Sequence, residues 1–185
     1  MPKMNTSEIK SWIKKNNVAD IILFGSSVRS NIEPRDIDLC ILIQDSEEKN
    51  SLELIESLSQ LLKNSPKKYH LTILKIGSFL SGNTLAKTLF TEGYSVKYDK
   101  PFSEVFGLES KSMFHYNLKH YTSSKRVQFH YLLRGRYGSI GILKETHGQL
   151  ISNQIIIIPT NKEDLLKKIL DQWQAKYKIT RILST

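Results

Sequence analysis

The sequence has only one cysteine and no long apolar run, and each of these two features excludes a class of protein. One cysteine, Cys40, cannot form a disulfide within the chain, so a small domain held together by internal disulfides is excluded. No apolar stretch approaches the roughly 20 residues that a membrane-spanning helix needs. The N-terminal stretch MPKMNTSEIK lacks the apolar segment of a secretory signal. We therefore expect a cytoplasmic protein without a membrane partner.

Acidic residues are scarce in the second half of the chain. Residues 1–100 contain 14 Lys and Arg against 12 Asp and Glu, whereas residues 101–185 contain 13 against 6, so most of the net charge of +9 lies in the second half. A basic surface suits a polyanionic partner such as nucleic acid, although positive charge also serves solubility. A length of 185 residues is enough for one ordinary core or for a compact pair of domains.

An apolar run, a small-residue turn and two acids follow one another between residues 21 and 43. Residues 21–24, IILF, are apolar and rich in β-branched side chains, which predicts a buried strand. The next three residues, Gly-Ser-Ser, predict a turn. Residues 36–43 predict a second buried strand, in which Asp36 and Asp38 share one face because strand side chains alternate.

The paired acids require a compensating cation. Two neighbouring carboxylates repel each other, and burial removes their hydration. Mg²⁺ prefers oxygen ligands and is commonly held by one or two carboxylates together with substrate phosphates. Backbone N–H groups of the Gly-Ser turn would bind such phosphates. The alternative is a pair of surface acids at a strand end, and the apolar character of both flanking strands argues against it.

Gly25-Ser26, nine intervening residues and then Asp36-Ile37-Asp38 resemble the glycine-serine and Asp-x-Asp signature of the DNA polymerase β-like nucleotidyltransferase superfamily. The similarity is strongest to the small members called minimal nucleotidyltransferases. It implies an α/β (α+β) fold with a mixed β-sheet and flanking helices. It also implies that Asp36 and Asp38 bind Mg²⁺, with Mn²⁺ as an alternative.

The resemblance assigns the turn to the nucleotide. Gly25, Ser26 and Ser27 would position the triphosphate of an incoming nucleoside triphosphate such as ATP. Arg29 lies between the turn and the acids in the sequence. It would contact the same phosphates, or it would be an ordinary exposed loop residue.

The third acid of the superfamily is replaced in this sequence. Residues 67–76 alternate in polarity and predict a third strand. In the superfamily this strand usually supplies a carboxylate that completes the metal site or acts as general base, and the matching residue is His70. His70 would serve as the base, or it would be a half-buried strand residue beside a site that has lost its chemistry. The sequence leaves both interpretations open.

Apolar periodicity completes the expected core and predicts a second α+β region. In the first hundred residues it predicts helices over residues 7–17, 51–64 and 85–92 and an edge strand over residues 94–99. No motif is apparent beyond Pro101. There the pattern predicts a helix ending at Leu133, a hairpin of strands 142–145 and 154–158, and a last helix capped by Thr160 or Asn161. The predicted domains are a nucleotidyltransferase-like core, residues 1–100, and a basic α+β region, residues 101–185.

Cations and aromatic residues alternate within the basic region. Such a mixture suits single-stranded nucleic acid, because cations bind phosphates and rings stack on bases. The alternative is that the rings belong to the core and the cations cover it. The candidate nucleic-acid residues are Lys125, Arg126, Arg134, Arg136 and Tyr137.

These observations support two functional hypotheses. The first is a metal-dependent nucleotidyltransferase that moves a nucleoside monophosphate from a nucleoside triphosphate to an acceptor hydroxyl. The acceptor would be RNA or DNA, which the basic half favours, or a protein or small molecule; some minimal relatives modify a partner toxin. The second is a protein of the same fold that binds nucleic acid or protein without efficient catalysis. The sequence leaves open the nucleotide base, the oligomeric state and the role of residues 101–185.

Overall fold

The computed structural model describes the chain apart from residues 1–4, 30–35, 46–49 and 80. The chain forms two compact units, Met1–Leu108 and Glu109–Thr185, whereas the sequence pattern predicted a boundary at residue 100. The expected α/β architecture, with a mixed sheet and flanking helices, is confirmed. None of the helices in the described part of the chain has both the length and the apolar character needed to span a membrane.

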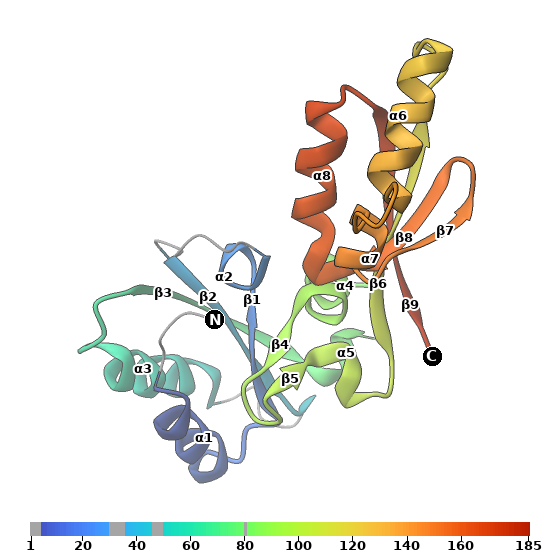
Figure 1. Cartoon of the computed structure of the whole chain (residues 1–185). Coiled ribbons are helices and arrows are strands. Elements are labelled where there is room, and N and C mark those ends of the chain that lie inside the picture. The colour runs from blue at the N-terminus through green and yellow to red at the C-terminus, as the bar shows by residue number, and fades with distance from the viewer. Residues whose placement is uncertain (1–4, 30–35, 46–49, 80) are drawn as a thin grey trace. The chain divides into compact units, whose positions relative to one another are not determined.

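The first unit is built on a five-stranded sheet with the order β3-β2-β1-β4-β5 (Figure 1). Its central strands β1 and β2 are antiparallel, and β2 and β3 are parallel, so the sheet is mixed. The three strands predicted from residues 21–24, 36–43 and 67–76 are all present. The strands are β1 (Asp20–Phe24), β2 (Asp36–Ile43), β3 (Lys68–Lys75), β4 (Tyr94–Ser95) and β5 (Lys100–Pro101).

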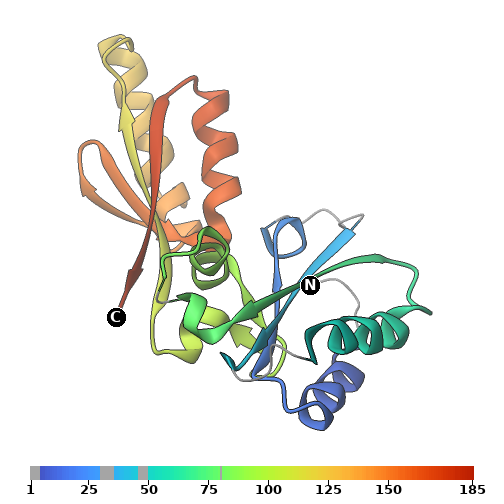
Figure 2. The same cartoon turned by 180° about the vertical axis from the view of Figure 1, so that it is seen from behind.

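Two helices pack on one face of this sheet. These are α1 (Thr6–Lys15) and α3 (Ser51–Leu62), which place their apolar stripes against the odd-numbered residues of β2 (Figure 2). The stripes consist of side chains spaced by three or four positions, which is the helical repeat. The buried residues in this layer are Ile9, Trp12, Ile13, Leu54, Leu58 and Leu62 from the helices and Ile37, Leu39, Ile41 and Ile43 from β2.

The opposite face of the sheet is apolar at one end and acidic at the other. Cys40 and Leu42 of β2 are buried there beneath α4 (Thr84–Glu92) and α5 (Phe102–Val105). Cys40 is therefore a core residue, as its place in an apolar run indicated. Asp36 and Asp38 lie on the same face at the start of β2 and are only half-buried. The α4 and α5 layer thus leaves this end of the face accessible. The remaining short elements of the unit are α2 (Ser26–Arg29) and the 3₁₀ helix η2 (Ile76–Phe79).

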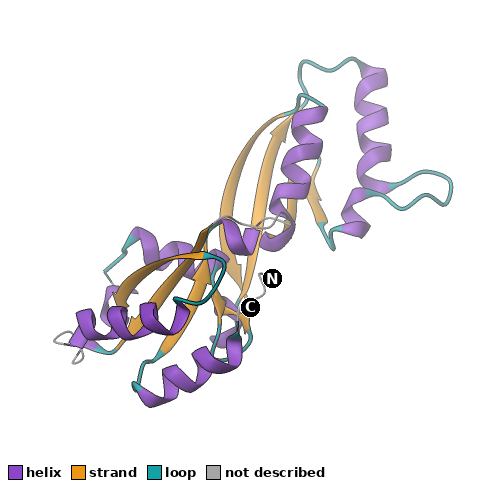
Figure 3. Ribbon diagram, turned by 90° about the vertical axis from the view of Figure 1, so that its left-hand side faces the viewer, coloured by secondary structure: helices purple, strands orange, loops and turns teal. Residues whose placement is uncertain are grey.

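The second unit is a four-stranded antiparallel sheet with the strand order β7-β8-β6-β9. Helices α6 and α8 both lie on one face of it, where their apolar side chains pack on β6 and β8 (Figure 3). The chain order β-α-β-β-α-β with this strand order is the ferredoxin-like, split βαβ arrangement. The elements are β6 (Glu109–Asn117), α6 (Ser123–Arg134), α7 (Ile142–Glu145), β7 (Gln149–Ser152), β8 (Ile155–Pro159), the 3₁₀ helix η3 (Thr160–Lys162), α8 (Glu163–Gln172) and β9 (Lys176–Ser184).

Three expectations for this unit were wrong or incomplete. Residues 142–145 form a single helical turn, because the N–H groups of Lys144 and Glu145 donate to the Gly141 carbonyl instead of to a strand partner. The hairpin exists, but β7 supplies its first strand. Thr160 and Asn161 form η3 rather than capping α8. The predicted helix ending near Leu133 is present, with Thr122 as its cap and Gly135 after it.

The strands β6 and β9 were missed altogether. In β6 the buried residues Ser112, Phe114 and Tyr116 alternate with Met113, His115 and Asn117, and the buried serine and the outward methionine obscure the alternation in the sequence. Strand β9 alternates Lys and Thr with partly buried side chains, so it has no continuous apolar signature. Tertiary pairing of β6 with both β8 and β9 makes them strands.

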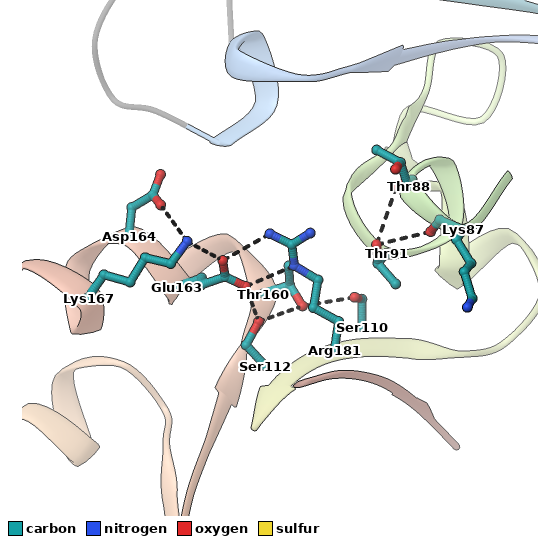
Figure 4. Close-up of polar contacts among 10 residues, drawn as sticks. All are labelled: Lys87, Thr88, Thr91, Ser110, Ser112, Thr160, Glu163, Asp164, Lys167 and Arg181. Carbon is teal, nitrogen blue, oxygen red and sulfur yellow. Dashed lines mark hydrogen bonds and ion pairs between the residues drawn. The ribbon is translucent and has the colours of Figure 1, made fainter. Parts of the chain in front are cut away.

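A buried carboxylate joins α8 to the sheet of the second unit (Figure 4). Glu163 is 4% exposed and accepts two hydrogen bonds of 2.9 Å from the Arg181 guanidinium. The Lys167 ammonium lies 2.6 Å from Glu163 Oε1, and the Ser112 hydroxyl donates to Oε2 at 2.6 Å. Burial alone would raise the pKa of Glu163, but these donors outweigh it and hold the pKa at about 2.

Replacement of Glu163 by Gln is expected to lower the free energy of unfolding at pH 7 by about 3 kcal/mol, because it removes the charge that neutralises two cations. The folded pKa lies below the unfolded value of about 4.3, so the stabilisation is present above that pH and is lost as pH falls towards 2. Urea denaturation between pH 3 and pH 7 should therefore show a smaller pH dependence in the variant. Asp164→Asn, at a more exposed acid 3.8 Å from Lys167, is the control and should change little. Equal pH dependence in Glu163→Gln and the native chain would contradict this account.

Candidate functional site

The acidic end of β2 lies between β1 and β3, the two strands that pair with it. Asp38 pairs in register with Phe24, the last residue of β1, and with His70 of β3. Residues in register on adjacent strands point to the same face. The three central strands therefore bring the glycine turn after β1, the Asp-x-Asp segment and the histidine together.

The Asp38 carboxylate lies between Gly25 and His70. Gly25 has a φ of +73°, and a β-carbon at this position would come within 2.4 Å of Asp38 Oδ2. Only glycine allows both this left-handed backbone and this close approach. The other oxygen, Oδ1, lies 3.3 Å from His70 Nδ1. The carboxylate is thus oriented from both sides while about a third of the side chain stays exposed.

Asp36 lies on the same face, two residues before Asp38, and is also half-buried. Its partner in register on β3 is Lys68, an exposed residue that the sequence analysis did not single out. The signal was present, because Lys68, His70 and Thr72 alternate with the core residues of the third strand. Lys68 would supply a positive charge to a phosphate bound beside the acids.

The turn residues divide into different roles. The Ser27 hydroxyl is buried and donates a hydrogen bond of 2.8 Å to the Phe24 carbonyl, so it holds the turn together. Ser26 is exposed at the first position of α2 and is the better placed of the two to meet a ligand. Arg29 ends α2, and its side chain lies outside the described part of the chain.

The residues present fit a magnesium ion that the substrate helps to hold. In the described part of the chain, no group of three or more His, Cys, Asp or Glu residues could hold a metal ion by themselves. Asp36 and Asp38 offer carboxylate oxygens, which Mg²⁺ prefers, on a partly exposed surface. Two carboxylates and the phosphate oxygens of a nucleotide make a common coordination set for this ion.

The candidate nucleic-acid residues all lie in the second unit. The Lys125 ammonium is 4.3 Å from the centre of the Tyr121 ring, near the start of α6. The Arg126 side chain donates to the carbonyls of Leu118 and Lys119, so it also fixes the preceding loop. Arg134, Arg136 and Tyr137 lie at the other end of the helix. The structure therefore places these residues at two ends of α6 rather than at one point.

Gly25→Ala is expected to destabilise the chain more than an equally strained substitution elsewhere. An alanine with φ above zero costs about 1 kcal/mol through its backbone, and here its β-carbon would also displace the Asp38 carboxylate. Gly107→Ala is the matched control, because Gly107 has a φ of +72° and a β-carbon added there would meet no atom within 4 Å. Urea denaturation of both variants measures the difference. Equal losses would show that the contact between Gly25 and Asp38 is not tight.

Comparison with known proteins finds a family model that matches the segment carrying this site. Residues 7–94 match the family model described as polymerase beta, nucleotidyltransferase, and this segment contains β1, α2, β2 and β3. No curated protein matches the chain.

Two solved structures show a weak similarity. A crystal structure of a mutant of the toxin-antitoxin MntA-HpeT is 22% identical with a TM-score of 0.37, and a crystal structure of a toxin-antitoxin with AMP-PNP is 22% identical with a TM-score of 0.36. Each match covers 50% of this chain and 73% of the other, and TM-scores this low carry no weight for fold or function. The family match and the arrangement of Gly25, Asp36 and Asp38 agree: residues 7–94 resemble the polymerase β-like nucleotidyltransferases.

Proposed function

We propose that this protein transfers a nucleoside monophosphate from a nucleoside triphosphate to an acceptor hydroxyl. The observation that carries the proposal is the position of the Asp38 carboxylate, with one oxygen against the Gly25 turn and the other beside His70. Asp36 on the same face gives the second carboxylate. A nucleotide phosphate bound at the turn would therefore lie next to two acids and one imidazole.

Asp36 and Asp38 would hold Mg²⁺, or Mn²⁺, together with the phosphates. When bound, the ion supplies positive charge that stabilises the charge developing on the transferred phosphoryl group. Gly25 and Ser26 orient the triphosphate, and Lys68 faces it from β3. The acceptor oxygen then forms a bond to the α-phosphorus, the bond to the β-phosphate oxygen breaks, and pyrophosphate leaves.

His70 is the proposed general base. A carboxylate only accepts hydrogen bonds, so the contact of 3.3 Å with Asp38 Oδ1 favours the tautomer with the imidazole proton on Nδ1. The lone pair then lies on Nε2, which would take the proton of the acceptor hydroxyl. The half-exposed side chain leaves room for an acceptor to approach.

We propose nucleic acid as the acceptor, because the second unit carries most of the net positive charge. The alternative remains a binding protein of the same fold with weak or absent catalysis. The observation that favours it is the histidine in the place of a third carboxylate. The two candidates differ in turnover, which the following variants measure.

Asp36→Asn and Asp38→Asn are expected to lower the transfer rate about 100-fold or more, because each removes an anionic oxygen that positions the metal ion and the phosphates. The assay incubates the full chain with labelled nucleoside triphosphate, Mg²⁺ or Mn²⁺ and an RNA pool. Glu53→Gln, at an exposed acid of α3, is the control and should retain the native rate. Labelled product that persists in both Asn variants would rule out this site, and no product from the native chain would favour the binding protein.

His70→Gln is expected to lower the rate about 100-fold, because glutamine keeps a donor for Asp38 and cannot accept the hydroxyl proton as a base. The loss should appear in kcat more than in the apparent KM for the nucleotide. His70→Asp tests the opposite interpretation. A gain in rate with aspartate would show that the histidine has replaced a more effective acid and is not the base.

A further inference from the structure

Residues 110–144 contain no Asp or Glu, although they make up almost half of the second unit. The same stretch holds seven cations and three histidines, and it includes all of α6 and the loop after it. Lys111 is paired with Glu109, just outside the stretch, at 2.8 Å, and a surface built from the other cations attracts polyanions. The cations are Lys111, Lys119, Lys125, Arg126, Arg134, Arg136 and Lys144.

An arginine is stacked between two tyrosines at the C-terminal end of α6. The guanidinium carbon of Arg136 lies 4.7 Å from the ring centre of Tyr131 and 4.7 Å from that of Tyr137. Both distances are typical of a cation held over an aromatic face. Tyr131 is 42% exposed and Tyr137 is 92% exposed. We call these three residues the stacking platform.

The loop that carries the platform has a defined structure. The Ser139 hydroxyl accepts from the Arg136 N–H at 2.8 Å and donates to the Arg136 carbonyl at 2.7 Å. Gly135 and Gly141 approach each other so closely that a β-carbon on Gly141 would lie 2.3 Å from the Gly135 nitrogen. Hydrogen bonds and close packing thus hold Arg136 in place. The Arg136 side chain is presented on a fixed backbone instead of a mobile one.

Tyr137 is held in an unfavourable backbone conformation with its ring in solvent. Its φ of +47° is in the left-handed region, which is uncommon for a residue with a side chain. Strain of this kind persists where the surrounding structure imposes it and often marks a binding site. A large ring exposed in this way contributes almost nothing to the core of the unit. The conformation therefore serves a contact outside the chain better than it serves stability.

We propose that the stacking platform receives an unpaired base of single-stranded nucleic acid, an inference that rests on the proposed transfer to a nucleic-acid acceptor. Aromatic rings and guanidinium planes stack on any base, and single strands offer bases that are not already stacked in a duplex. The cations of α6 would contact the phosphates on either side. Charge complementarity selects a polyanion, and the planar groups select a nucleic acid over an acidic protein.

Binding of a labelled RNA of about 12 nucleotides to the full chain tests the proposal, with an abasic oligomer of equal length as comparison. Both oligomers carry the same phosphates, so their difference measures the bases at a fixed salt concentration. We expect the abasic oligomer and the RNA duplex to bind about 10-fold more weakly than the single strand. Equal affinity for the single strand and the abasic oligomer would overturn the proposal.

Tyr137→Ala is expected to weaken binding of the single strand about 10-fold and to leave binding of the abasic oligomer unchanged. Tyr137→Phe keeps the ring and should bind as the native chain does. The matched control is Tyr98→Ala, since Tyr98 is 51% exposed and has the Lys97 ammonium 5.4 Å from its ring, but lies in the first unit. An equal loss with the abasic oligomer, or a loss with Tyr98→Ala as large as with Tyr137→Ala, would contradict base stacking.

Binding of a poly-glutamate chain tests whether the platform recognises an acidic protein instead of a nucleic acid. If it binds as tightly as the RNA and loses affinity in Tyr137→Ala, the platform recognises an acidic protein and the proposal is wrong. All these measurements omit nucleotide and metal ion, so they do not depend on catalysis. Base-dependent binding of RNA by a native chain that gives no product in the transfer assay would show failure of the proposed transfer and not of the platform.

Discussion

The candidate site depends on the contact between the Asp38 carboxylate and the backbone of Gly25. A carboxylate held this closely needs a residue without a β-carbon and with a left-handed backbone, and glycine alone meets both conditions. The hydrogen bond from Ser27 to Phe24 fixes the turn that presents the glycine. One oxygen of Asp38 is thereby turned towards the Gly25 turn and the other towards His70.

The sheet of the first unit explains why acids can remain at this position. One face is covered by α1 and α3, while α4 and α5 cover only the apolar end of the other. The strand β2 therefore has buried residues on both faces along most of its length and half-exposed acids only at its start. Partial exposure lowers the cost of placing two like charges side by side, and it leaves the carboxylates accessible from outside the chain.

The charged side chains of the second unit have two different roles. Glu163 is buried, surrounded by donors and fixed, so it stabilises the junction of α8 with the sheet. The cations around α6 have no acid near them in the sequence between residues 110 and 144. Some of them hold the structure, as Arg126 does by capping two carbonyls, while Arg136 is stacked on exposed rings. Positive charge in this unit is therefore partly structural and partly available to a ligand.

The sequence by itself determined the local elements of the first unit and the face of the two acids. The short β-branched run, the alternation of Asp36, Asp38 and Cys40, and the alternation of residues 67–76 are local signals, so β1, β2 and β3 followed from them. Only the tertiary structure decided that Lys68 pairs with Asp36, that His70 contacts Asp38, and that β6 and β9 are strands. Strand register and the ferredoxin-like order join residues far apart in the chain, and local periodicity indicates the face of each residue but not its partner on the neighbouring strand.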